Sequence, residues 1–142
     1  MALTPGNIDT MVTIGETVEV ETAASQPSRT YAVNWQTGRV AGFVDGIDAL
    51  KQAIYKILQT ERFAHIIYSW NYGFEANRII GQSAAYLKSE IQRLITEALL
   101  ADDRITAVEN FKINITGKRR AAVEFTVASV FGETNIETEV NI

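Results

Sequence analysis

Two stretches of the chain carry apolar residues at the three- and four-residue spacing of an amphipathic helix. The first follows Asp45, a suitable N-cap, and ends near Thr60; the second follows Ser83 and ends before Asp102. Their apolar stripes consist of Ile47, Leu50, Ile54, Ile57 and Leu58, and of Leu87, Ile91, Leu94, Ile95, Ala98 and Leu99. We therefore expect two helices with one buried face each. On the polar side of the second, Arg93 is spaced to pair with both Glu90 and Glu97.

Elsewhere apolar and polar residues alternate, which is the period of a β-strand. The alternation predicts strands at 30–35 and 63–69, an antiparallel hairpin, and a final strand over 136–142. Breaks are expected at 36–38 and 42–46. The hairpin arms are marked by Phe111, Ile113 and Ile115, and by Val123, Phe125 and Val127. The order of elements predicts an α+β domain with two helices packed on one face of a mostly antiparallel sheet.

The first 29 residues differ from the rest of the chain. Strand spacing is present at Val12, Ile14, Val18 and Val20, and a small polar linker with a proline follows at 22–28. This segment is too short to build a core. Two interpretations stay open: a terminus without fixed structure, or an extended arm that orders on a neighbouring subunit by strand addition. We divide the chain into an arm at 1–29 and a domain at 30–142.

Composition excludes several classes of function. The 142 residues carry a net charge of −4, which does not suit binding to nucleic acid, and the chain has no cysteine for disulfides, thiol catalysis or metal sites. The start of the chain has neither the basic segment nor the apolar run of a secretory signal. No apolar run approaches the roughly 20 residues that span a bilayer. We expect a protein without cofactor, metal, nucleic acid or membrane partner.

Candidate catalytic residues are few. His65 is the only histidine and has no second soft ligand to form a metal site, and the basic triplet 118–120 falls on an expected turn. Glu61 and Glu75 are the one carboxylate pair worth testing, because glycosidases use two carboxylates about 5–10 Å apart. If 63–70 is one strand, however, these glutamates lie about 25 Å apart. They could approach only if the chain doubles back near Ser69.

An aromatic turn at 70–73 is the most informative local feature. Tyr68, Trp70, Tyr72 and Phe74 crowd it, so it is either a plug in the domain's core or a docking surface for a partner. Strand alternation puts Tyr68 and Trp70 on one face, which we expect to be the core. Candidates for partner contact are then Arg62, Tyr72 and Glu75.

Three motifs together resemble a known family: 57–62 (Ile-Leu-Gln-Thr-Glu-Arg), 68–73 (Tyr-Ser-Trp-Asn-Tyr-Gly) and 102–105 (Asp-Asp-Arg-Ile). They are similar to the baseplate protein, or sheath initiator, of contractile phage tails, tailocin-type bacteriocins and contractile injection systems, in particular the branch of Gram-positive phages and defective prophages. That family is often called lysozyme-like. The resemblance covers about residues 30–142 and implies a structural component rather than an enzyme.

The resemblance also implies roles for particular residues. The family's usual Glu-Pro-Arg corresponds here to Asp102, Asp103 and Arg104, and it joins the initiator to baseplate wedge proteins. The family's fold is similar to the strand-exchange domain of tail sheath proteins, so the final strand is expected to offer an open edge to the first sheath ring. That edge would involve Ile136, Thr138, Val140 and Ile142. The alternative is that this strand is simply paired inside the domain.

The expected function is therefore nucleation of sheath assembly in a contractile tail. Expected partners are the sheath protein, the wedge proteins and tail tube or hub proteins, with a ring of copies in the particle. Assembly in the bacterial cytoplasm, followed by residence in the virion or tail-like particle, is implied. Two alternatives stay open: a peptidoglycan hydrolase of the tail, and a free-standing adaptor.

Overall fold

The computed structural model describes residues 27–142, and these form an α+β domain, as the sequence predicts. One sheet contains β3 (Ile105–Gly117), β4 (Arg120–Ser129) and β5 (Gly132–Asn141), antiparallel and in that order. A second, two-stranded sheet is the hairpin of β1 (Thr30–Asn34) and β2 (Arg39–Val44). The expected arm at 1–29 lies, for residues 1–26, outside the described residues.

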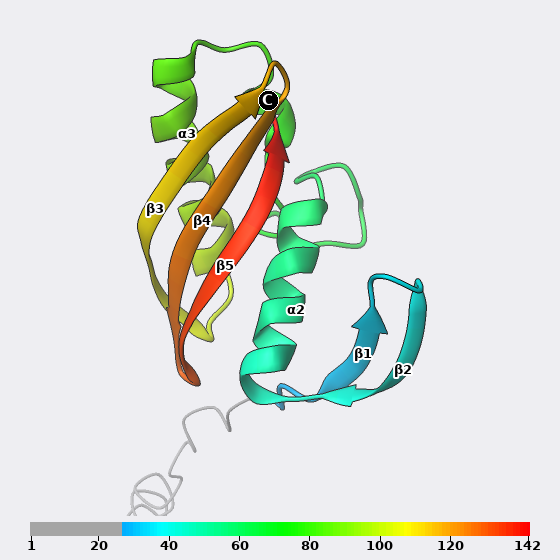
Figure 1. Cartoon of the computed structure of the whole chain (residues 1–142). Helices are drawn as coiled ribbons and strands as arrows, with labels where there is room; N and C mark the ends of the chain where they lie inside the picture. Colours follow the sequence, from blue (N-terminus) through cyan, green and yellow to red (C-terminus); the bar gives the residue numbers. More distant parts are fainter. Residues whose placement is uncertain (1–26) are drawn as a thin grey trace, which may run out of the picture.

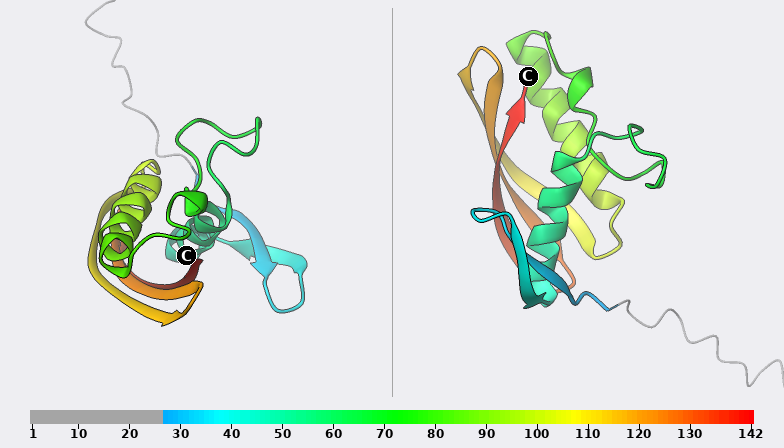
Figure 2. Two further views of the ribbon diagram at one scale, coloured as in Figure 1. Left: turned by 90° about the horizontal axis from the view of Figure 1, so that it is seen from above. Right: turned by 90° about the vertical axis from the view of Figure 1, so that its right-hand side faces the viewer.

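Two α-helices lie on one face of the three-stranded sheet (Figures 1 and 2). They are α2 (Gly46–Gln59), beside β5, and α3 (Ala84–Leu100), with a short 3-10 helix, η1 (Ala76–Arg78), between them in sequence. Asp45 starts α2 as expected: its side chain accepts a hydrogen bond from the Gly46 N–H at 2.7 Å. Hydrogen bonds from Ser28 and then Gly46 lower the pKa of this carboxyl.

The core lies between the helices and β4. All six apolar residues predicted for the α3 stripe are buried, as are the alternate β4 residues Val123, Phe125 and Val127. Phe111 of β3 stacks on Phe125 with ring centroids 5.3 Å apart. Burying a side chain of this size contributes about 1.5–3 kcal/mol, so this shared cluster is what fixes the helices to the sheet.

The elements of the structure differ from the sequence prediction at 42–46, at the final strand and at 63–69. The predicted break at 42–46 is partly wrong, because Gly42 lies inside β2, at an irregularity in its pairing with β1 and with a positive φ of 76°. The final strand is Gly132–Asn141 rather than 136–142, so it begins earlier and ends one residue before the last. The predicted strand at 63–69 does not exist; those residues form turns.

Candidate functional site

Residues 60–75 form a loop that is closed at its base by backbone hydrogen bonds. The Phe74 N–H donates to the Thr60 carbonyl at 2.8 Å, and the Arg62 N–H donates to the Phe74 carbonyl at 3.2 Å. Gly73 has a φ of +106°, and a Cβ at this position would lie 2.8 Å from the Thr60 oxygen. Only glycine fits there without strain. The chain therefore doubles back, and an apolar run that predicted a strand forms the projecting part of this loop.

The aromatic residues of the loop divide differently from the prediction. Tyr68 and Trp70 were expected in the core, but both are exposed, Trp70 to 80%, and neighbouring Ile66 and Ile67 are exposed too. Phe74 is the buried plug instead. Tyr72 is half-buried and stacks on Tyr68 with centroids 4.5 Å apart. Burial, followed by the charges of Tyr68 and Asp102, raises the pKa of Tyr72.

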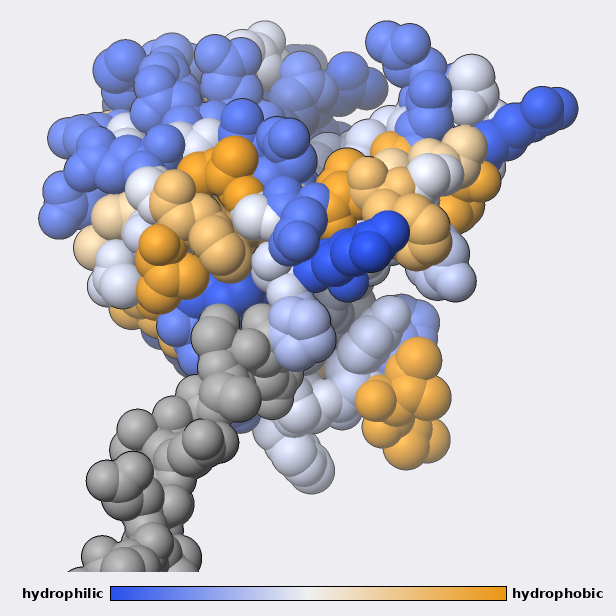
Figure 3. Space-filling model, turned by 90° about the horizontal axis from the view of Figure 1, so that it is seen from below, coloured by the Kyte–Doolittle hydropathy of each residue, from blue (hydrophilic) through white to orange (hydrophobic). Residues whose placement is uncertain are grey.

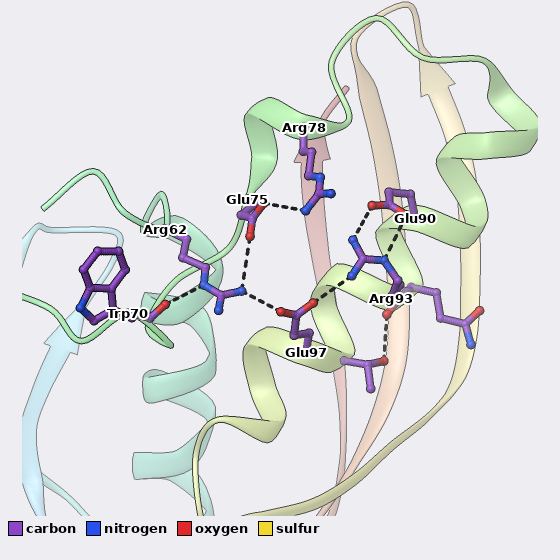
Figure 4. Close-up of polar contacts among 9 residues, drawn as sticks. Arg62, Trp70, Glu75, Arg78, Glu90, Arg93 and Glu97 are labelled. Carbon is purple, nitrogen blue, oxygen red and sulfur yellow. Dashed lines mark hydrogen bonds and ion pairs between the residues drawn. The ribbon is translucent and has the colours of Figure 1, made fainter.

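Arg62 holds the loop in place. Its Nε donates to the Trp70 carbonyl at 2.8 Å, and its Nη1 lies 3.3 Å from Glu75 Oε1 and 2.9 Å from Glu97 Oε1. The Arg62 side chain is only 16% exposed. Two of the residues proposed for partner contact, Arg62 and Glu75, therefore bind each other (Figure 4).

The charged cluster continues along α3. Arg93 pairs with Glu97 at 2.9 Å and also with Glu90, which confirms both pairs predicted from sequence spacing. Figure 4 shows these side chains forming one chain of contacts from the loop to the helix. Hydrogen bonds from Arg62 lower the pKa of Glu97, and those from Arg93 lower the pKa of Glu90. Glu90 and Glu97 therefore stay ionised to a lower pH than an isolated glutamate.

Asp102 and Arg104 form a forked pair at the turn between α3 and β3. Arg104 Nε lies 2.9 Å from Asp102 Oδ1, and Arg104 Nη2 lies 2.6 Å from Oδ2. Burial raises the pKa of Asp102, but the hydrogen bonds from the Arg104 side chain and backbone outweigh it, so the pKa lies below its usual value. These hydrogen bonds therefore connect the two ends of a turn in which the resemblance would place a proline at Asp103.

β5 lies at the end of the three-stranded sheet, and β4 is its one strand neighbour among residues 27–142. The Ile142 N–H bonds the Arg119 carbonyl, and ladder bonds alternate along antiparallel strands. The backbone groups of Ile136, Thr138 and Val140 therefore face β4, whereas the N–H groups of Glu137 and Glu139 point away from it. Val140 and Ile142 have buried side chains, so what this edge offers outward is backbone.

The loop base and the β5 edge meet at a shallow groove. Its lining comes from the end of α2, from the loop base and from β5: Leu58, Gln59, Glu61, Phe74, Ala76, Thr138, Glu139, Val140 and Asn141. A wider trough lies on the polar face of the sheet. Tyr55 and Gln59 of α2 line it together with residues of all three strands, among them Lys112, Glu124 and Glu137. Thr138 and Val140 of the predicted edge therefore lie beside the base of the loop.

The carboxylate pair proposed for catalysis has a structural explanation. Glu61 and Phe74 form a backbone bridge, so the expected separation of Glu61 from Glu75 rested on a strand that is not there. Glu75, however, is bound by Arg62 and, at 3.2 Å, by Arg78. Within residues 27–142, no group of three or more metal-binding side chains is found and no helix is long and apolar enough to cross a membrane.

Two functional features were not predicted from the sequence. Sequence spacing predicts only a surface pair of Glu97 with Arg93, whereas in the structure Glu97 also binds Arg62. The sequence predicts the first strand and the turn of the β1–β2 hairpin but not its second strand, because Gly42 indicates a break. The available signal is the set of β-forming residues Val40, Phe43 and Val44 after the turn at 36–38.

An open sheet edge and an exposed apolar loop are the features of a protein that assembles with others. Residues 29–132 match the contractile injection system sheath initiator family, and the chain belongs to that family. It is also similar to the phage-like element PBSX protein XkdS of Bacillus subtilis strain 168. The two are 40% identical over 126 residues, which cover 86% of this chain and 89% of the relative. The protein is thus a structural component of the baseplate and sheath region of a contractile tail.

Proposed function

We propose that this protein nucleates the contractile sheath by offering the outer edge of β5 to a strand of the first sheath ring. The observation that supports this is the outward direction of the Glu137 and Glu139 N–H groups at the end of the sheet. An incoming strand gains main-chain hydrogen bonds there. The two acidic side chains oppose pairing between two copies of β5, because like charges would face each other.

Glu139→Pro tests this proposal. Proline removes the outward N–H of Glu139, and the ladder to β4 keeps its bonds because Thr138 and Val140 supply them. The matched control is Glu139→Ala, which keeps the N–H. Each variant takes the place of the parent protein in baseplates of its particle, and sheath protein is then added. Electron microscopy is expected to show no sheaths with Glu139→Pro and normal sheaths with Glu139→Ala.

Sheaths of normal number and length with Glu139→Pro would contradict edge templating. Thermal unfolding of both variants checks that the domain is intact. Deletion of 136–142 is a poorer test, because it removes the buried side chains of Val140 and Ile142 from the core. Deleting the whole gene in its source should leave tails without sheath; normal sheaths would favour a free-standing adaptor.

We also propose that the forked turn of Asp102 and Arg104 docks on a wedge protein, near Arg62, Tyr72 and Glu75. A guanidinium has five N–H donors. Two donors of the Arg104 side chain bind Asp102, so the other donors are available to a carboxylate of the partner. Arg104→Ala is expected to fold but to be missing from purified baseplates. Normal incorporation would contradict the docking role.

A ring of copies around the tail tube or hub, built in the bacterial cytoplasm, completes this proposal. We propose no enzymatic activity, since Glu75 is held by two arginines and serves the loop. A zymogram on peptidoglycan tests this: clearing that is lost in Glu75→Gln would favour the hydrolase alternative.

A further inference from the structure

The β1–β2 hairpin carries an uncovered apolar surface. Tyr31 is 64% exposed, Val40 61% and Phe43 57%, and the rings of Tyr31 and Phe43 stack with centroids 5.0 Å apart. Seen from below, hydrophobic residues gather in separate groups on an otherwise mostly polar surface (Figure 3). Exposed apolar residues that are held together in this way mark a contact surface.

The two edges of the hairpin are not equivalent. Gln52 of α2 covers the outer edge of β1: its Nε2 donates to the Tyr31 carbonyl at 2.7 Å, and its Oε1 accepts from the Val33 N–H at 2.9 Å. β2 lies on the side away from α2, and in the described part of the chain it pairs with β1 alone (Figure 1). Only the β2 edge is therefore open to a further strand.

The hairpin is also complementary in charge to the segment that precedes it in sequence. Residues 29–44 contain Arg29 and Arg39 and no acidic residue. Residues 1–26 contain no lysine or arginine, and their four acidic residues are Asp9, Glu16, Glu19 and Glu21. Within this acidic segment, 12–21 has the apolar alternation of a strand. At about 3.3 Å per residue, ten residues are long enough to cover the six of β2.

We propose that residues 12–21 of a neighbouring copy add to the outer edge of β2 as a third strand. The chain's own segment is the poorer donor, because it enters the hairpin at β1, whose outer edge Gln52 covers. To reach β2 it would have to cross the hairpin face, where the Arg29 guanidinium lies 4.4 Å from the Phe43 ring centroid. The linker 22–29 spans up to about 26 Å, enough to reach an adjacent copy. This arm exchange is separate from the use of β5 by the sheath.

The absence of cysteine from the chain allows a direct test by disulfide trapping. One full-length protein carries Val40→Cys on β2. It is mixed in turn with full-length proteins carrying Thr17→Cys, Val18→Cys, Glu19→Cys or Val20→Cys and oxidised. The matched control replaces Val40→Cys by Ser89→Cys, which is exposed on α3. A strand shows alternate residues to one face, so the arm–hairpin disulfide should form severalfold faster at every second arm position than at its neighbours.

The control with Ser89→Cys should give only slow, unpatterned cross-linking. Added salt should slow the arm–hairpin reaction, because it screens the attraction between the acidic arm and the arginines. Equal rates with Val40→Cys and Ser89→Cys would overturn the proposal. So would a disulfide confined to one chain in the double variant Val18→Cys with Val40→Cys, because that result assigns the strand to the same copy.

Discussion

Arg62 and Glu97 lie 35 positions apart in sequence, and their side chains meet with Arg62 Nη1 2.9 Å from Glu97 Oε1. Arg62 is at the base of the projecting loop, and Glu97 is on α3, in the element that supplies much of the core. The contact therefore fixes an exposed loop to the rigid part of the domain. A loop that is already held in one conformation loses less conformational entropy when a partner binds it.

Arg62→Ala should destabilise the domain by about 1–3 kcal/mol, because it leaves the Glu75 carboxylate and the Trp70 carbonyl without their shared donor. The measurement is urea unfolding at neutral pH. Arg78→Ala is the control: its side chain is 57% exposed, so its pair with Glu75 should contribute about 0.5 kcal/mol or less. Equal losses in both variants would show that Arg62 does not organise the loop.

Gly73→Ala should cost about 2–4 kcal/mol, since alanine adds a Cβ against the Thr60 carbonyl in a backbone conformation with positive φ. At Gly117 no atom lies within 4 Å of an added Cβ and φ is not in the left-handed region. Gly117→Ala should therefore change the free energy of unfolding by only about 0.5 kcal/mol in either direction. Comparable melting temperatures for the two variants would contradict the closed-loop geometry.

Asp102 should make stability depend on pH in the acid range. Its pKa is lower in the folded protein than the usual 3.8, so its contribution is complete above the unfolded value and is lost as pH falls through the folded value. Asp102→Asn should be less stable than the parent at neutral pH, and the difference should shrink on acidification to about pH 2.5.

Arg104→Ala should remove the same pH dependence, because it takes away the donors that lower the Asp102 pKa. Urea unfolding from neutral to acid pH measures both variants. A difference that does not change with pH would mean that Asp102 titrates alike in the folded and unfolded chains.

Phe74→Ala and Trp70→Ala should behave in opposite ways although both residues are aromatic and belong to one loop. Phe74 is buried, so its truncation should cost about 3–5 kcal/mol. Trp70 is exposed, and its truncation should change stability by about 0.5 kcal/mol or less. Thermal unfolding compares them. A large loss for Trp70→Ala would return that ring to the core, as strand alternation had predicted.

The helices and the three-stranded sheet could be predicted because local sequence and tertiary packing agree there. The apolar residues of the α3 stripe, from Leu87 to Leu99, keep the helical period, and Val123, Phe125 and Val127 keep the strand period. The residues of both sets are buried. Asp45 supplies a cap at the position where α2 begins. Each of these signals is contained in a few neighbouring residues, so the helices and strands can be predicted from the sequence alone.

The loop could not be predicted, because what shapes it is distant in sequence. Residues 63–69 have the composition of a strand, but the Phe74 N–H closes onto Thr60 and leaves them no strand partner within the described chain. Arg62 is held by Glu97, which lies 35 positions further along the chain on α3. Strand alternation predicts that Tyr68 and Trp70 are buried in the core. That prediction is wrong because residues 63–69 do not belong to a sheet.

The way the loop is closed has an evolutionary consequence. Its base depends on backbone atoms of Thr60, Arg62 and Phe74 and on the small size of Gly73. The residues at its tip, such as Ile66 and Ile67, contribute nothing to the core. Natural selection should therefore tolerate changes in the length and side chains of the tip, because the domain beneath it keeps its fold.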